Sequence, residues 1–138
     1  MSLSLEEKLA IHELLGRAAF AYDERDIPML ESCFANSAVL SMRIAGGDLI
    51  GPFSGRGSVM QLFHDSMAQQ SDVRRHLVSN IFFDESGDNP LAISNLTLVA
   101  TENGEIQLLS AGIYRDTVVR EEGAWRILDR YLELDKSY

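Results

Sequence analysis

The chain has 138 residues, of which 46% are hydrophobic and 24% charged, as is typical of a globular protein with a full-sized core. Its formal net charge of -9 disfavours a nucleic-acid or anionic-membrane partner, because both need a basic patch. No stretch reads as a signal peptide or membrane span, and one cysteine excludes an intrachain disulfide, so we expect a cytoplasmic protein with a single domain, 1–138.

The N-terminal segment predicts a long helix. Ser4 and Glu7 form a capping box, in which each side chain satisfies a free backbone N–H at the helix start. A buried stripe follows at helical spacing, formed by Ile11, Leu14, Leu15, Ala18 and Tyr22. Asp23 lies near the C-terminus of this predicted helix, where the helix macrodipole disfavours a carboxylate. Because this arrangement breaks a local rule, Asp23 becomes a candidate functional residue.

Two more helices are predicted before residue 74. Asp26 is a suitable N-cap for a short helix over 27–34. Ser58 and Gln61 form a second capping box, which predicts that a third helix begins there and runs to about residue 70.

The remaining segments predict strands. Two form a hairpin around Gly46-Gly47, and four longer strands follow one another through short polar turns. The predicted ranges are 38–44, 48–53, 75–84, 91–101, 105–120 and 124–135. Consecutive short turns imply an antiparallel meander, and helices segregated from such a sheet give an α+β fold. A bend at Gly112 would wrap the sheet against the helices as a cone with an internal pocket, the usual place for a small ligand.

The strand that begins at Arg74 reads as apolar on both faces. Alternation places His76 and Phe82 on one face, and Leu77 and Phe83 on the other. The pattern therefore predicts a strand covered on both faces. It also predicts that His76 needs a buried hydrogen-bond partner.

Several stretches together resemble the SnoaL-like branch of the nuclear-transport-factor-2-like superfamily, over nearly the whole chain. They are residues 21–26 (AYDERD), 30–35 (LESCFA), 75–80 (RHLVSN) and 112–116 (GIYRD), followed by 123–127 (GAWRI) and Arg130. The resemblance implies a cone-shaped α+β barrel, with three N-terminal helices packed on a strongly curved antiparallel sheet.

One subgroup with these stretches is scytalone-dehydratase-like. The resemblance implies that Tyr22, Asp23 and His76 meet inside the cone. That subgroup carries a second pocket histidine on the next strand, where this chain has Asn95. The resemblance also places polar pocket residues near Ser110.

The second subgroup is the non-catalytic β subunit of aromatic-ring-hydroxylating dioxygenases, which is similar in the Arg-His…Ser-Asn strand and in the ending of the chain. Under this alternative the chain would assemble with a dioxygenase α subunit, without Rieske ligands or an iron site of its own. A third alternative is a binder of hydrophobic metabolites without turnover.

The leading hypothesis is an acid–base dyad of Asp23 and His76, with Tyr22 donating a hydrogen bond to a substrate oxygen. A carboxylate on one imidazole nitrogen fixes the tautomer, and the other nitrogen then faces the substrate. This chemistry is that of a dehydratase or isomerase acting on a small hydrophobic cyclic or aromatic molecule, and it needs no cofactor. The alternative interpretation is structural: a buried ion pair that anchors the helix to the sheet, beside a core tyrosine.

The substrate-binding candidates are Asn95, Ser110 and Tyr114, which we assign to the pocket face of their strands. The opposite face is apolar and predicts a homodimer or higher homo-oligomer. We expect no metal site, because the histidines and the cysteine lack ligand spacing. Asp116 and Arg130 lie on neighbouring strands, where opposite charges can pair across the ladder.

Overall fold

The structure is a computed structural model that describes residues 2–138. Its helices are α1 Leu5–Glu24, α2 Ile27–Ser32 and α3 Arg56–Ala68. Its strands are β1 Phe34–Ile44, β2 Ile50–Ser54, β3 Val73–Asp84, β4 Leu91–Glu102, β5 Glu105–Glu121 and β6 Ala124–Leu134.

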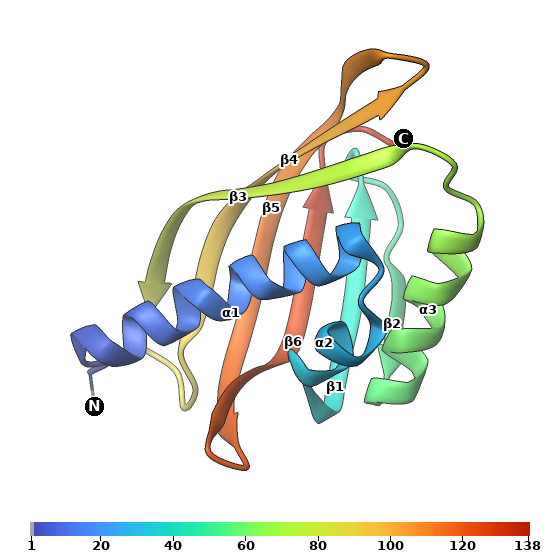
Figure 1. Cartoon of the computed structure of the whole chain (residues 1–138). Helices are drawn as coiled ribbons and strands as arrows, with labels where there is room; N and C mark the ends of the chain where they lie inside the picture. Colours follow the sequence, from blue (N-terminus) through green and yellow to red (C-terminus); the bar gives the residue numbers. More distant parts are fainter. Residues whose placement is uncertain (1) are drawn as a thin grey trace.

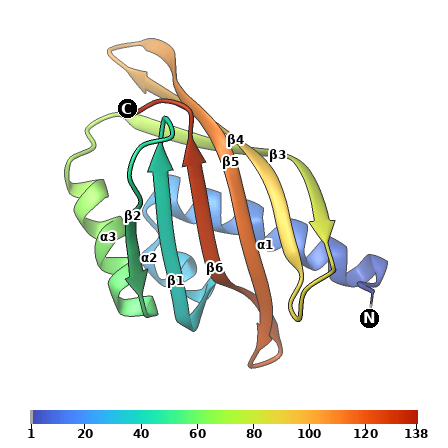
Figure 2. The same cartoon turned by 180° about the vertical axis from the view of Figure 1, so that it is seen from behind.

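The six strands form one curved sheet in the order β2-β1-β6-β5-β4-β3, so that β2 and β3 are its edges. Neighbouring strands run antiparallel except β1 and β6, which are parallel. The helices lie on the concave face, with α1 crossing the sheet and α3 standing beside β2 (Figure 1). The view from behind shows the convex face without a helix over it (Figure 2). The predicted α+β cone with three helices on a curled, mostly antiparallel sheet is confirmed.

Local capping explains where the helices start. Ser4 and Glu7 make both hydrogen bonds of the predicted capping box, and Asp26 caps α2 through the backbone N–H of Met29. The predicted capping box at Ser58 is wrong. The helix begins two residues earlier, at Arg56, because Gly55 adopts φ 89 and turns the chain without a side-chain cap.

The first strand begins at Phe34, four residues before its predicted start. Phe34 pairs with Ile127 of β6, and the backbone N–H of Ile127 donates to the carbonyl of Cys33 at 2.8 Å. This parallel pairing joins distant parts of the chain. It also shortens α2, which ends at Ser32 and not at residue 34.

The exposure of one side of β3 contradicts the prediction that this strand is covered on both faces, because Leu77 and Phe82 are 48% and 57% exposed. A bulge also changes which residues share a side. Asn80 adopts φ 56, and the pairing with β4 shifts between Ser79 and Phe82. The extra residue reverses the alternation, so His76 shares the half-buried concave side with Phe83, and Phe82 is exposed on the convex side.

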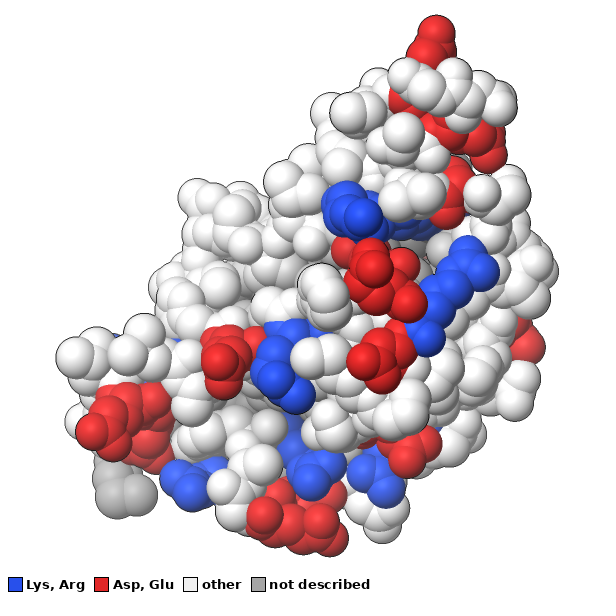
Figure 3. All heavy atoms as spheres, in the orientation of Figure 1, with Lys and Arg blue, Asp and Glu red and all other residues white. Residues whose placement is uncertain are grey.

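The main core lies between α1 and the concave face of the sheet, and it includes Ile11, Leu15 and Phe34. A second cluster of buried side chains lies farther along the cone and consists of Leu96, Tyr114, Leu132 and Leu134. On the face that α1 crosses, acidic and basic side chains lie interspersed (Figure 3). None of the helices within residues 2–138 is long and apolar enough to cross a membrane.

Candidate active site

The end of α1 and the beginning of β3 bring Asp23 and His76 into contact. One carboxylate oxygen of Asp23 lies 2.6 Å from Nδ1 of His76, and the other accepts the backbone N–H of His76 at 2.7 Å. Both side chains are largely buried, at 5% and 11% exposure. An ionised carboxylate can accept hydrogen bonds but cannot donate one. We therefore assign the ring proton of the neutral imidazole tautomer to Nδ1, which faces Asp23. The lone pair of Nε2 is then available on the other side of the ring.

Tyr22 precedes Asp23 and packs edge-on against the His76 ring, with ring centroids 5.1 Å apart. Its hydroxyl oxygen accepts a hydrogen bond from Nε2 of Gln70 at 2.9 Å. Burial raises the pKa of Tyr22, and the hydrogen bond from Gln70 opposes this only in part. The side chain is therefore a neutral phenol near pH 7, and its own proton remains available to a ligand oxygen.

A narrow cavity of about 80 Å³ opens beside these residues, inside the cone. Its polar lining consists of Tyr22, Ser66, His76, Tyr114, Arg130 and Tyr138, and the rest of the wall is apolar. The cavity is small beside the roughly 300–1,000 Å³ of sites for drug-sized ligands. A ligand that fits without rearrangement must therefore be small.

Comparison with protein families supports this architecture. Residues 3–131 match the family model described as the SnoaL-like domain. The chain belongs to the SnoaL-like family. A search of the curated proteins found no match.

Solved structures share the fold of this SnoaL-like protein. A cystatin-like-fold protein of unknown function from Nostoc punctiforme is 24% identical with TM-score 0.82, and the alignment covers 99% of this chain and 97% of the other. Two further structures of similar fold, both from Novosphingobium aromaticivorans, carry functional assignments. One, assigned as a scytalone dehydratase, is 21% identical (TM-score 0.75; coverage 94% and 85%). The other, assigned as the β subunit of an aromatic-ring-hydroxylating dioxygenase, is 18% identical (TM-score 0.77; coverage 94% and 89%).

The three predicted substrate-binding residues do not lie together. Tyr114 is buried on the concave face and lines the cavity, and burial raises its pKa. Ser110 also points inward, but it donates to the carbonyl of Lys136 at 2.6 Å and is not part of the cavity wall. Asn95 pairs with Ile113 and is exposed on the convex face, so assigning it to the pocket face is a mistake of one residue in register.

Three polar residues of the cavity wall were not among the predicted site residues: Ser66, Arg130 and Tyr138. Arg130 forms the predicted cross-strand pair with Asp116, but it also reaches the cavity. Tyr138 follows β6 and lies at the cavity, with its ring 5.0 Å from the Arg74 guanidinium carbon. Arg130 alternates with the buried apolar residues Leu132 and Leu134, and this arginine on an apolar face was the signal that could have identified it.

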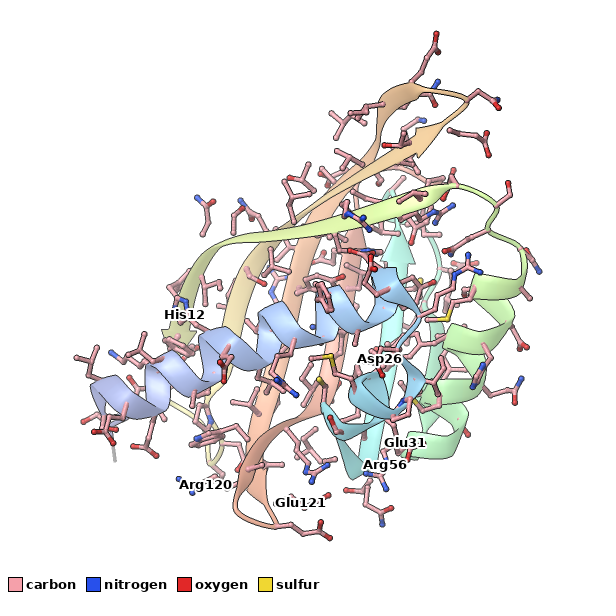
Figure 4. The ribbon with its side chains drawn as sticks, viewed as in Figure 1. His12, Asp26, Glu31, Arg56, Arg120 and Glu121 are labelled. Atoms are coloured by element: carbon pink, nitrogen blue, oxygen red, sulfur yellow. The ribbon has the colours of Figure 1, made fainter. Side chains whose placement is uncertain are left out.

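A wider, open groove of about 540 Å³ lies between α1 and the β5–β6 hairpin, away from His76. Arg120 is part of its lining, and this hairpin lies across the molecule from the entrance of β3 (Figure 4). Most of the polar side chains that line the groove are charges of both signs, and the Asp23–His76 pair is not part of it, so it is a weaker candidate. Among residues 2–138, no three His, Cys, Asp or Glu side chains gather as metal ligands would.

Proposed function

We propose that this SnoaL-like protein is a cofactor-independent dehydratase or isomerase, which acts on a small hydrophobic cyclic or aromatic substrate in the cone. The observation that carries the proposal is the two-point contact of Asp23 with His76. It holds the imidazole in one orientation and one tautomer, beside a cavity that is mostly apolar. The fold shared with a protein assigned as a scytalone dehydratase is consistent with such chemistry.

In the proposed reaction, Nε2 of His76 takes a proton from a carbon next to a carbonyl of the substrate. The electrons of the broken C–H bond move toward the carbonyl oxygen, where the Tyr22 hydroxyl donates a hydrogen bond. Asp23 stabilises the imidazolium that forms. Return of the proton to a different carbon completes an isomerisation. Return of the proton to a departing hydroxyl group releases water and completes a dehydration.

The experiment is hydrogen–deuterium exchange at carbon, followed by NMR in D₂O with 1-indanone and 2-cyclohexen-1-one as probes. We expect the wild-type protein to accelerate exchange next to the carbonyl. Asp23→Asn and His76→Gln should each reduce the acceleration by a factor of about 100 or more, as is typical for a general base. His64→Gln is the matched control, because His64 is an exposed histidine on α3 outside the cavity. Full exchange in Asp23→Asn would refute the dyad, and binding of a probe without exchange would favour the metabolite-binder alternative.

The convex face of the sheet supports a second candidate function. Leu77 and Phe82 of β3 are 48% and 57% exposed, and Leu108 of β5 is 69% exposed. Apolar patches of this kind mark protein interfaces. The face would serve a homodimer or higher homo-oligomer in either function. In a dioxygenase β subunit, whose fold this chain shares, it would serve assembly with an α subunit.

Light scattering after size-exclusion chromatography separates these states. A homo-oligomer that becomes monomeric in the Leu77→Lys, Phe82→Lys double variant supports self-association through this face. A wild-type monomer that acquires a fixed stoichiometry with a co-expressed dioxygenase α subunit would instead support the β-subunit function.

A further inference from the structure

We propose that Arg130 binds an uncharged oxygen of the ligand at the end of the cavity away from His76, so that the ligand carries a second oxygen remote from its reacting carbon. This inference rests on the proposed function, because it requires that the cavity takes a small molecule.

Arg130 has one nitrogen left over from its ion pair. It lies on the concave face of β6, where Nε and Nη2 bind the two carboxylate oxygens of Asp116 at 2.7 and 3.0 Å. This side-on pairing leaves Nη1 outside the pair. Because Arg130 is also part of the cavity wall, Nη1 is the donor that a ligand can use.

Aromatic rings hold the guanidinium group in place. Its central carbon lies 4.0 Å from the ring centre of Tyr114 and 5.8 Å from that of Phe34. Such contacts restrict the group to one plane. The Tyr114 hydroxyl is a second donor on the same wall, since burial raises its pKa and keeps it protonated.

A contribution to the stability of the fold does not by itself explain the buried ion pair of Arg130 and Asp116. Asp116 is fully buried and the Arg130 side chain is 9% exposed. A buried ion pair usually stabilises a fold no better than apolar side chains of the same size. Burial by itself would lower the pKa of Arg130, but the Asp116 carboxylate more than offsets this and keeps the guanidinium charged. The chain thus maintains a charged donor at a cavity whose other walls are largely apolar.

The charges around Arg130 favour a ligand oxygen that is uncharged. The Asp116 carboxylate already balances the positive charge of Arg130 through two hydrogen bonds. An anionic ligand oxygen would therefore find no unpaired positive charge at Arg130, and it would lie near the Asp116 carboxylate. A carbonyl, ether or hydroxyl oxygen meets a donor without that repulsion.

The position of Arg130 implies a separate oxygen from the one that Tyr22 binds. His76 is on β3 and Arg130 on β6, with β4 and β5 between them. In a flat sheet they would be separated by three strand spacings, about 14 Å, and by a register offset of six residues along β5, from Ser110 to Asp116. The curvature of the cone brings both residues to the wall of one cavity. A ligand in contact with both residues must reach across the cavity.

The test uses three acetophenones that differ only at the para position: 1,4-diacetylbenzene, 4-isopropylacetophenone and 4-acetylbenzoate. Affinities are measured by NMR titration of the wild type, the Asp116→Leu, Arg130→Met double variant and Tyr114→Phe. We expect the wild type to bind 1,4-diacetylbenzene about tenfold to a hundredfold more tightly than the isopropyl compound, since the hydrogen bond involves a charged donor. The double variant should reduce this ratio to about one and leave the affinity for the isopropyl compound within about twofold.

Four outcomes would overturn the inference. In the first two, the affinity ratio of 1,4-diacetylbenzene to 4-isopropylacetophenone persists in the folded double variant, or it disappears in Tyr114→Phe but not in the double variant. In the third, 4-acetylbenzoate binds more tightly than 1,4-diacetylbenzene. In the fourth, the wild type binds the two neutral probes equally well. Failure of all three probes to perturb the cavity resonances of the wild type would refute the proposed function as well. If the double variant does not fold, ¹⁵N spectra of the wild-type arginine side chains decide the matter. Only 1,4-diacetylbenzene should shift the Arg130 nitrogens, and equal spectra with both neutral probes would refute the assignment.

Discussion

The contact between Asp23 and His76 makes a quantitative prediction about stability. Asp23 accepts two hydrogen bonds from His76, one from the ring and one from the backbone, and both partners are largely buried. Hydrogen bonds to a charged group contribute about 1.5–3 kcal/mol each. In Asp23→Asn, the amide oxygen can keep one of the two bonds in weaker, neutral form. We therefore expect a loss of about 2–4 kcal/mol, which lowers the melting temperature by roughly 3 °C per kcal/mol for a chain of this size.

A double-mutant cycle separates the ring bond from the backbone bond. In His76→Phe only the backbone N–H remains for Asp23, so Asp23→Asn should cost about 1 kcal/mol in that background. The difference, a coupling energy of about 1–3 kcal/mol, measures the ring bond. Urea unfolding followed by fluorescence of the single tryptophan, Trp125, provides all four free energies. A coupling below about 0.5 kcal/mol would show that the imidazole and the carboxylate are not bonded in solution.

Asp26→Asn is the matched control for the same chemical change. Asp26 caps α2 through the backbone N–H of Met29 and is exposed. Asparagine is an equally good N-cap, so this change should alter the free energy of unfolding by less than about 0.5 kcal/mol.

Three further predictions concern the buried part of the sheet. A Cβ added at Gly112 would lie 2.3 Å from the backbone oxygen of Glu133, so Gly112→Ala should lower the free energy of unfolding by about 2–3 kcal/mol in urea. Among the described residues, Ser94 carries the buried hydroxyl without a hydrogen-bond partner, so Ser94→Ala should leave the melting temperature unchanged or raise it; a loss above 1 kcal/mol would reveal a bound water or partner. Burial raises the pKa of Tyr22 and Tyr114, so their stabilising effect is present below pH ~10, the ordinary tyrosine value, and is lost as pH rises toward the folded values. Melting temperatures measured above pH 10 should fall less steeply in Tyr114→Phe than in the wild type.

Much of the fold follows from local signals in the sequence. The capping box at Ser4 and the helical stripe after it define α1, and polar turns containing Gly104 and Gly123 separate the last three strands. The contact of Asp23 with His76 is a different case, because the two residues are 53 positions apart. No local pattern joins them, and the resemblance to the SnoaL-like family was the signal that brought them together.

The face of each strand could not be read from alternation alone, because single-residue irregularities change it. Asn80 adopts a left-handed backbone conformation, which asparagine tolerates better than most residues. Many asparagines in strands are extended, so the presence of Asn80 in the sequence does not predict a bulge. A similar register shift between Thr117 and Val118 affects β5 and β6. The position of Asn95 was misassigned for the same reason: one residue decides between the cavity and the solvent.

The hydrogen bond from the backbone N–H of His76 to Asp23 connects the proposed catalytic residue to the solubility of the protein. Since β3 is an edge of the sheet, its outward N–H groups can pair with the strand of another molecule, and the Asp23 carboxylate occupies the one at His76. A substitution that redirects the chemistry of this position also frees a pairing site on an edge strand with exposed apolar side chains. Libraries that vary Asp23 should therefore lose members to aggregation before those members are assayed, and the surviving sequences would underestimate how many activities the cone can support.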